Sequence, residues 1–498
     1  MMKIIIRFWA LALGLLLCES GFAQPKLLQG KINSPGGGYY APTISSDGKT
    51  LIYEANLRTG WKVFETHLLP DSTWDEPIYI EEINNTGNED DFIGGPILTY
   101  DGNYIFYTSD RQDGFGYTDL WFSKRMGDKW SIPVNLGEPV NTSGYEGFPS
   151  LSSDGSTLYF MRIAEPDTKD SVSCFVIYSS KLMPDGKWST PVALPAPINT
   201  GCESYPRIMA DGKTLLFSSY REGGLGKTDI YKSVMQNDST WSTPVPFSFL
   251  NTPLEDAMVT VPASGDVLYY TAGKKDDTYL YSLVIPKELR QEISVVVKGV
   301  VKDKETNNPM GALVEFKDIE TNKLMGSANS NEVDGKYMVV LPKGKIYDFS
   351  VSLKGYTFYS SRFDLTMADK YVEMENDISL ETLKENTTFT LNNIVFDSNS
   401  AKLKPELLPE LDRMVNMMKI NPDIKVEISA HTDDIGTDAA NLALSQNRAS
   451  SVVKYLTDNG VTPQRLIAKG YGETHPRVPN KNDVNRSLNR RVEFKIIK

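Results

Sequence analysis

Histidine and cysteine are scarce in this chain, with three of each among 498 residues. The histidines, His67, His431 and His475, stand in different sequence settings and do not form a pattern of metal ligands. The motifs H-E-x-x-H and G-x-S-x-G and the phosphate-binding Walker loop are also missing. We therefore expect a protein that is not an enzyme and that uses neither a cofactor nor a metal.

Positive charge is in deficit as well. The chain has 52 Lys and Arg against 64 Asp and Glu, a net charge of −12, and no block of basic residues. This balance argues against a nucleic-acid partner. An apolar content of 40% with 23% charged residues is typical of globular domains. The length predicts about three of them.

Beyond the N-terminus, the sequence lacks any run long and apolar enough for a transmembrane helix. The basic start, the short apolar run of residues 8–17 and the small-x-small site at Ala23 predict a signal peptide over residues 1–23. Acylation of Cys18 is the alternative, although Leu17 stands where lipoprotein signals usually carry a small residue. The mature chain is expected in the periplasm or on a membrane that it does not span.

The last hundred residues contain the motifs with the clearest chemistry. These motifs are Phe396-Asp397-Ser398-Asn399, His431-Thr432-Asp433-Asp434-Ile435-Gly436, Asn441-Leu442-Ala443-Leu444-Ser445-Gln446-Asn447-Arg448-Ala449, Gly470-Tyr471-Gly472-Glu473 and Asn489-Arg490-Arg491-Val492-Glu493-Phe494. Asp433 falls in a loop and Arg448 on a helix, and such a pair can hold a ligand that carries both an ammonium and a carboxylate. The alternative is a surface ion pair that contributes little.

This stretch, from about residue 387 to the end, resembles the OmpA C-terminal domain, which binds peptidoglycan. The resemblance implies that Asp433 takes the ammonium and Arg448 the carboxylate of diaminopimelate in the cell-wall peptide. It also implies a pocket lined by four further residues, namely Asn399, Asp397, Thr432 and Asn441. We expect an α+β domain over residues 381–498, with strands at 388–396, 425–430, 465–469 and 492–497. The expected helices begin at Pro405 and span residues 438–459, the second ended by Gly460.

Residues 27–286 form a repeat array. Each unit has an apolar strand, a turn at Asp-Gly or Gly-Asp and a Tyr/Phe-rich strand, and its turn glycines are Gly48, Gly102, Gly155, Gly212 and Gly265. A second hairpin ends on a Trp-x-x-Pro strand in four units, at Trp74, Trp130, Trp188 and Trp241. Five units of four strands predict a five-bladed β-propeller, closed by an N-terminal strand at residues 27–33. The repeats resemble the WD40-like Pd repeat of the TolB propeller.

The loops that lead into each unit are expected on one face of this propeller, and they contain Glu89, Glu146, Glu203 and Glu255. Two Arg-Gly-rich loops, at 111–119 and 221–229, are expected on the same face. These polar residues either cap strand ends or form a protein-docking surface. Cys174 and Cys202 fall on the same face. The compartment permits a disulfide, but the sequence does not fix the separation of the two cysteines.

Residues 293–375 alternate short strands with turns, which predicts a small β-sandwich. The pattern resembles the carboxypeptidase regulatory-like domain, a non-catalytic, prealbumin-like fold, and we interpret it as a rigid spacer. A polar linker follows at residues 375–386.

These parts predict an adaptor that binds peptidoglycan non-covalently and anchors an outer-membrane-associated complex, with the propeller as the platform for outer-membrane or periplasmic proteins. The layout is similar to the propeller-plus-OmpA proteins of the type IX secretion system, but the chain lacks the helical repeats and the clear lipidation cysteine of that system's peptidoglycan-binding component. One alternative is an outer-membrane structural protein without a secretion role. A pore-forming OmpA-type barrel is the other, and the Asp-Gly hairpin repeats argue against it. The expected location is the periplasm or the periplasmic face of the outer membrane.

Overall fold

The computed structural model describes residues 24–34, 37–57, 60–88, 91–163, 174–237, 240–274, 277–390, 396–397 and 399–497. The expected signal peptide, with Cys18, and Glu89 lie outside these ranges. The chain falls into two compact units. The first comprises residues 1–299, 317–347 and 364–376, and the second comprises 300–316, 348–363 and 377–498. Within the described ranges, no helix combines the length and the apolar character needed to cross a membrane.

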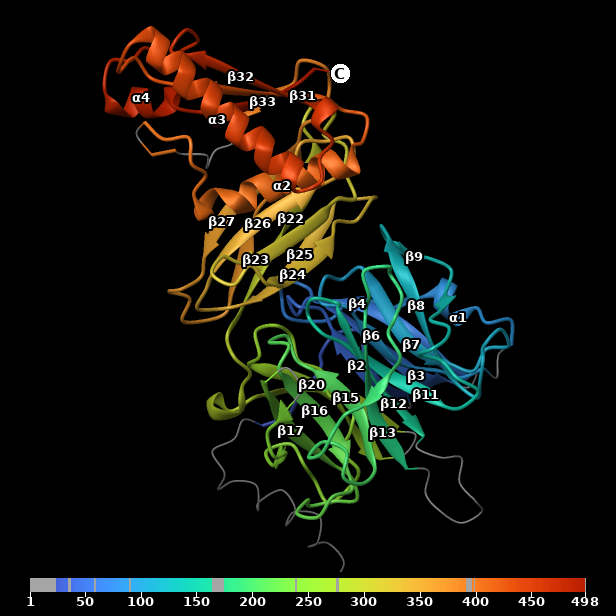
Figure 1. Ribbon diagram of the computed structural model, residues 1–498. Helices are drawn as coiled ribbons and strands as arrows, with labels where there is room; N and C mark the ends of the chain where they lie inside the picture. Colours follow the sequence, from blue (N-terminus) through green and yellow to red (C-terminus); the bar gives the residue numbers. More distant parts are fainter. Residues whose placement is uncertain are drawn as a thin grey trace, which may run out of the picture. The chain divides into compact units, whose positions relative to one another are not determined.

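The first unit is built almost entirely of β-strands, and its strands follow the sequence repeats (Figure 1). Repeat one gives β2 (Gly38–Ile44), β3 (Thr50–Leu57), β4 (Gly60–His67) and β5 (Ile78–Tyr79), followed by the short helix α1 (Glu81–Asn84). Repeat two gives β6 (Ile93–Leu98), β7 (Tyr104–Ser109), β8 (Asp119–Met126), β9 (Lys129–Trp130) and β10 (Val134–Asn135). Repeat three gives β11 (Glu146–Leu151), β12 (Thr157–Ile163), β13 (Phe175–Lys181) and β14 (Val192–Ala193). Repeat four gives β15 (Glu203–Ile208), β16 (Thr214–Ser219), β17 (Asp229–Asn237), β18 (Thr240–Trp241) and β19 (Val245–Pro246).

The fifth repeat and the N-terminus share a sheet. Strands β20 (Val267–Lys274) and β21 (Asp277–Val284) form a hairpin, and β1 (Lys26–Leu27) pairs antiparallel with β21. The N-terminal segment therefore does add a strand to the last repeat, but that strand ends at Leu27 instead of extending to residue 33. A single parallel pair, Gly38 with Thr278, joins this sheet to that of repeat one, so the two repeats form one seven-stranded sheet.

The first hairpin of each repeat has two recurring backbone features. Its turn places a glycine such as Gly48 at φ 71°, a conformation that glycine adopts without steric cost. Its first strand is bulged, as the register shift between Tyr40 and Thr43 shows. The bulge holds Ala41 at φ 42° and precedes Pro42, which has no N–H to donate to the ladder.

The tryptophans of the Trp-x-x-Pro motifs lie before the outermost strand of each repeat, not within it. Strand β5 begins directly after Pro77 and strand β10 directly after Pro133. A proline cannot donate a ladder hydrogen bond, so the regular pairing starts after it. Trp74, Trp130 and Trp241 are buried, and they join the apolar clusters between neighbouring repeats.

Each repeat is also fastened by one asparagine side chain. The Asn141 carboxamide accepts from the Leu120 N–H at 2.9 Å and donates to the Leu120 carbonyl at 3.0 Å. Four other asparagine side chains make the same two hydrogen bonds, one to the N–H and one to the carbonyl of a single strand residue. The pairs are Asn33 with Leu280, Asn84 with Val63, Asn199 with Ile177 and Asn251 with Ile230. The carboxamide thus satisfies two backbone groups that the outer strand leaves unpaired.

Five apolar clusters lie between successive repeats. They join repeats one and two, two and three, three and four, and four and five. The fifth cluster joins the last repeat to the first through residues such as Leu280, Tyr53 and Trp74. Every repeat therefore buries both of its faces against neighbours, and the series of contacts closes on itself.

The strands between residues 294 and 380 fall into two four-stranded sheets. One contains β22 (Ser294–Asp303), β25 (Lys336–Pro342), β28 (Val372–Glu375) and β29 (Ile378–Leu380). The other contains β23 (Leu313–Asp318), β24 (Leu324–Asn329), β26 (Ile346–Ser352) and β27 (Tyr359–Asp364). The alternating burial of β26 matches the period of two that the sequence shows.

The C-terminal part of the second unit is a mixed sheet packed against helices (Figure 1). The sheet order is β30 (Thr388–Thr390), β33 (Val492–Ile496), β31 (Val426–His431) and β32 (Leu466–Gly472). The helices are α2 (Leu408–Ile420), α3 (Asp438–Asp458) and α4 (Asp483–Asn489). Strands β31 and β32 are parallel, with α3 as the connection between them. The expected strand at 388–396 is observed only as far as Thr390, and residues 391–395 lie outside the described ranges.

Candidate functional site

Arg448 projects from the middle of α3 toward the segment that contains residues 396–400. Its Nε donates to the Ser400 carbonyl at 2.9 Å, and its Nη2 donates to the Asp397 carbonyl at 3.0 Å. The guanidinium carbon lies 5.1 Å from the centre of the Phe396 ring. Two nitrogens of the fork therefore hold the backbone, and among the described residues Nη1 makes no hydrogen bond.

Asp433 follows the end of β31 and is buried, with 7% of its surface exposed. Its Oδ2 accepts a hydrogen bond from Arg490 Nη1 at 2.6 Å, and its Oδ1 accepts from the Ile435 N–H at 3.2 Å. Burial and the nearby Arg490 lower the pKa of Arg448, whereas Asp433 raises it. Asp433, Arg448 and Arg490 therefore lie close enough to act on one another electrostatically.

The path of the chain explains why these residues meet. Thr437 caps α3 by accepting from the Ala440 N–H at 3.3 Å, so the helix begins just after the Asp433 loop. Glycine at position 470 lets α3 lie directly on β32, because a Cβ there would come within 2.3 Å of the Gln446 nitrogen. The strand end and the helix are thus held together by packing outside the site.

Asn441 and Thr432 are both buried beside Asp433. The Asn441 carboxamide donates to the Asp433 carbonyl at 3.3 Å and to Glu473 Oε2 at 2.5 Å. Within the described part of the chain, the Thr432 hydroxyl has no hydrogen-bond partner. Asn441 therefore orients the Asp433 loop, and Thr432 leaves a buried polar atom for a ligand.

Asp397 and Asn399 are placed differently. The Asp397 side chain is exposed and pairs with Lys404 at 2.5 Å, so Asp397 contacts Arg448 through its carbonyl and not through its carboxylate. Asn399 is exposed and has φ 54°, a left-handed conformation that asparagine tolerates better than most residues. In this structure, both residues shape the loop that Arg448 holds.

Two residues of this site have no predicted role from the sequence. Arg490, in the closing Asn-Arg-Arg motif, is the partner of Asp433, and Glu473, in the Gly-Tyr-Gly-Glu motif, is the partner of Asn441. Both motifs stand out in the sequence, but only the fold reveals which side chain each one meets. His431 is buried, and its ring stacks on Tyr471 with centroids 5.2 Å apart.

The glutamates of the expected docking face in the first unit are largely internal. Glu146 and Glu203 are fully buried and pair with Arg162 at 2.8 Å and with Arg221 at 3.2 Å. The expectation of a ring of surface glutamates is therefore wrong for these two positions, where the carboxylates tie strands together. Glu255 is exposed and lies 3.5 Å from Lys227.

Cys174 and Cys202 are joined in a disulfide, with Cα atoms 4.8 Å apart. Cys174 directly precedes β13 and Cys202 directly precedes β15. The bond therefore links the third repeat to the fourth at one end of their strands.

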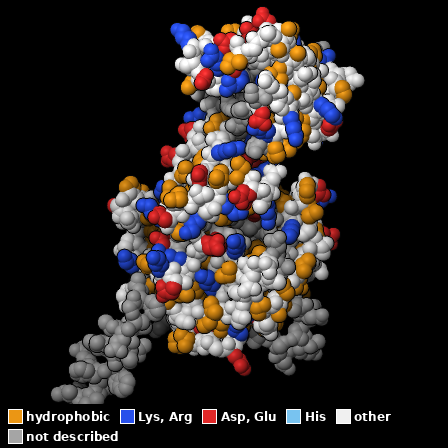
Figure 2. All heavy atoms as spheres, turned by 60° about the vertical axis from the view of Figure 1, so that its left-hand side comes forward, with side chains coloured by type: hydrophobic (Ala, Val, Ile, Leu, Met, Phe, Trp, Pro, Cys, Tyr) orange, Lys and Arg blue, Asp and Glu red, His pale blue; other side chains and the backbone are white. Residues whose placement is uncertain are grey.

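Acidic and basic side chains are interspersed on the face of the molecule that Figure 2 shows. No large area of a single sign is visible there.

Comparison with known proteins identifies the C-terminal part. Residues 395–490 match the OmpA family. The chain ends in an OmpA family domain. The match includes Asp433, Arg448 and Arg490 and leaves the first unit uncovered.

Individual relatives cover about a fifth of the chain. The chain is 43% identical over 110 residues to a Gloeobacter violaceus protein named photosystem I P700 chlorophyll a apoprotein A2, covering 21% of this chain and 13% of that protein. It is 39% identical over 103 residues to outer membrane porin F of Pseudomonas fluorescens, covering 21% and 32%. The peptidoglycan-associated lipoprotein from Burkholderia pseudomallei is a solved structure with 28% identity and a TM-score of 0.20, covering 20% of this chain and 86% of that one. The chain thus spans less than a third of the two curated relatives.

Proposed function

We propose that the OmpA-like domain, residues 381–498, binds peptidoglycan non-covalently and anchors the protein to the cell wall. Asp433 receives the ammonium and Arg448 the carboxylate of the diaminopimelate side chain. Asn441 and Thr432 line the same pocket, and the loop of Asp397 and Asn399 borders it. The family match and the complete order of the sequence motifs support this assignment.

The observation that carries the proposal is the meeting of a buried carboxylate and a buried guanidinium that are not paired with each other. Arg448 donates two hydrogen bonds to backbone carbonyls. These hydrogen bonds fix the guanidinium and leave Nη1 available to a ligand. Asp433 keeps acceptor capacity on Oδ1 beside its single hydrogen bond. A ligand with both charges satisfies both groups at once.

Arg490 occupies the position on Asp433 that a ligand cation would take. Its Nη1 lies 2.6 Å from Oδ2, which is the distance of a strong charge-assisted hydrogen bond. An incoming ammonium shares the carboxylate with Arg490 or displaces it. Arg490 keeps the buried Asp433 charge compensated when the site is empty.

Sedimentation with insoluble sacculi tests the proposal in the chain 24–498. Asp433→Asn keeps the shape of the side chain and removes its charge, and we expect it to lose pelleting with sacculi. Asp434→Asn is the matched control, because Asp434 is the next residue and pairs with Arg486 at 2.8 Å instead. Equal pelleting of the two variants, with unchanged circular dichroism, would show that Asp433 is not the ammonium site.

We also propose that residues 27–286 form a five-bladed β-propeller of the WD40-like Pd type. Three observations support it: the five repeats of hairpins, the closed series of apolar clusters and the asparagine device that recurs in every repeat. Residues 293–375 are proposed to be a carboxypeptidase regulatory-like β-sandwich that acts as a spacer.

The propeller is proposed as a docking platform for outer-membrane or periplasmic proteins. Exposed apolar side chains in its loops support this role, namely Phe115 at 53%, Tyr117 at 76%, Leu225 at 64% and Leu254 at 65%. Cross-linking in envelope extracts tests it. We expect Tyr117→Ser with Leu225→Ser to lose the cross-linked partners, and Ile132→Ser, at a residue 82% exposed elsewhere, to retain them.

The proposed location is the periplasm or the periplasmic face of the outer membrane, in line with a cell-envelope relative such as outer membrane porin F. Membership of a type IX secretion complex is the more specific form of the proposal. A structural role in the outer membrane is the second candidate. Deletion of the gene would favour this role if it weakened the envelope without a loss of secretion.

A further inference from the structure

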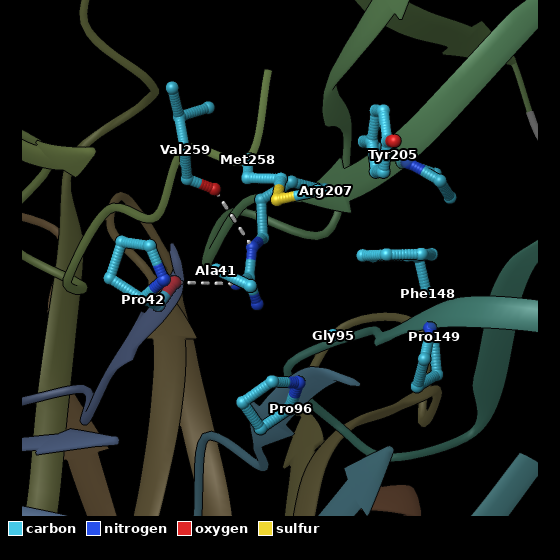
Figure 3. Close-up of a pocket in the computed structure, with 11 residues that line it drawn as sticks. Ala41, Pro42, Gly95, Pro96, Phe148, Pro149, Tyr205, Arg207, Met258 and Val259 are labelled. Carbon is cyan, nitrogen blue, oxygen red and sulfur yellow. Dashed lines mark hydrogen bonds between the residues drawn. The ribbon is translucent and has the colours of Figure 1, made fainter. Parts of the chain in front are cut away.

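The first segments of the five repeats, which are bulged strands in repeats one to four, surround a cavity of about 30 Å³ (Figure 3). Each repeat contributes a residue in a left-handed conformation, namely Ala41, Gly95, Phe148, Tyr205 and Met258. In four repeats the next residue is a proline, which has no N–H. The wall is therefore poor in backbone hydrogen-bond donors at these positions.

Arg207 is the exception in this wall. Figure 3 shows its side chain reaching toward Pro42 and Val259. Its Nε donates to the Val259 carbonyl at 3.2 Å, and its Nη2 donates to the Pro42 carbonyl at 3.4 Å. The other ten lining residues, all of them described, are uncharged.

The fourth repeat places an arginine where three other repeats place a short hydroxyl side chain and the second repeat places Ile97. The equivalent residues Thr43, Ser150 and Thr260 each accept a hydrogen bond from a backbone N–H of the following repeat. That bridging role needs no charge. Arg207 joins repeats as well, through the Val259 and Pro42 carbonyls, but those hydrogen bonds need a donor and not a charge.

Three other arginines in the first unit have a carboxylate partner, whereas the buried Arg111 donates to the Ile83 carbonyl and lies over the Trp121 ring instead. Arg125 pairs with Glu65 at 2.8 Å, Arg162 with Glu146 at 2.8 Å and Arg221 with Glu203 at 3.2 Å. Arg207 has no such ion pair among the described residues. An uncompensated charge in a protein interior is strongly destabilising.

Glu54 is a buried carboxyl that contacts the cavity wall at Gly95, and no ion pair joins it to Arg207 among the described residues. Its carboxyl accepts the Gly95 N–H at 2.7 Å, and burial raises the pKa of Glu54 to about 8. Burial therefore disfavours the charged form of Glu54, which makes it a poor counter-ion. Burial lowers the pKa of Arg207 only to about 10, so the guanidinium keeps its charge.

We propose that this cavity is an anion site in which Arg207 binds one carboxylate or a comparably small anion. Arg207 lines the cavity and is half-buried as a residue, and its Nη1 makes no hydrogen bond to a described residue. The space admits groups of the size of one or two waters, since one water requires about 10–15 Å³. The carboxylate comes either from a free small anion or from an acidic side chain or C-terminus of a bound protein.

Thermal unfolding of the chain 24–498 in increasing sodium formate tests this site, with ionic strength held constant by a bulky sulfonate salt. We expect a saturating rise in Tm for the wild type. Arg207→Met should abolish the rise. It should also match or exceed the wild-type Tm without formate, because it removes the uncompensated charge.

Arg125→Met is the matched control, since it removes a paired arginine from the same unit. It should lower Tm but keep the response to formate. If Arg207→Met does not fold, Arg207→Gln takes its place. Binding of formate to the wild type is then also measured as broadening of the ¹³C-formate NMR line. A wild type without a saturating response, or equal responses in wild type and Arg207→Met, would overturn the proposal.

A second titration distinguishes the two sources of the carboxylate. A short peptide that ends in Glu is added in place of formate, with the same wild type and Arg207→Met variant. Tighter binding of the peptide than of formate identifies a partner's carboxylate. Binding of formate alone identifies a free anion.

Discussion

Arg448→Lys should separate the shape of the guanidinium from its charge. In the OmpA-like domain, Arg448 donates through Nε and Nη2 to the carbonyls of Ser400 and Asp397. A lysine keeps the charge but can replace only one of these hydrogen bonds in that geometry. Each hydrogen bond from a charged donor contributes about 1.5–3 kcal/mol, so we expect the free energy of unfolding to fall by about that amount.

Arg465→Lys supplies a control with nearly the same loss of structure. Arg465 donates through Nε to the Ile424 carbonyl at 2.9 Å and through Nη2 to the Asn421 carbonyl at 2.6 Å, outside the proposed site. Both variants should therefore lose similar stability in urea unfolding. Only Arg448→Lys should also lose affinity for sacculi, by about 2–5 kcal/mol, or roughly thirty- to several-thousand-fold.

The outcome of this pair bears directly on the role of the arginine fork. Normal pelleting of a folded Arg448→Lys variant would show that a point charge suffices and that the bidentate geometry is irrelevant. An equal loss of pelleting in Arg465→Lys would assign the effect to destabilisation of the whole domain.

Three further predictions concern the first unit. Because Cys174 and Cys202 are bonded, the chain 24–498 should show no reactive thiol under denaturing, non-reducing conditions, and two alkylated cysteines would contradict the bond. Burial raises the pKa of Glu65, but His67, Arg125 and Trp130 lower it to about 2. Above pH 5, the free energy of unfolding of the wild type should therefore exceed that of Glu65→Gln by about 3 kcal/mol. Urea titrations should show this difference vanish as the pH falls from about 4.5 to 2. Asn141→Ala removes two buried hydrogen bonds and should cost about 1–3 kcal/mol, whereas Asn237→Ala, at an exposed position, should leave Tm unchanged.

Local patterns in the sequence were sufficient for most elements of the C-terminal domain. The helix predicted over 438–459 is α3, Asp438–Asp458, because Thr437 and Gly460 mark its ends. Helix α4 was not predicted, since its seven residues carry no apolar periodicity and its start depends on the Asn482 cap. The strand predicted at 465–469 extends to Gly472 because β31 pairs with it along its whole length.

Tertiary partners were beyond the reach of sequence reasoning. Asp433 and Arg448 stand out by motif, but the Asp433–Arg490 pair depends on how β33 leads back past β31. The expected surface glutamates Glu146 and Glu203 are internal because Arg162 in β12 and Arg221 just after β16 reach them. Charge in a loop therefore does not indicate exposure where a neighbouring strand supplies a counter-ion.

The central claim is that one site grips both charges of diaminopimelate, and calorimetry with two stem peptides tests it most directly. A tripeptide with diaminopimelate carries the side-chain carboxylate, and the same peptide with lysine lacks it. We predict that the chain 24–498 binds the diaminopimelate peptide at least thirty-fold more tightly, and that Arg448→Gln removes this preference. Equal affinities for the two peptides in the wild type would contradict the account.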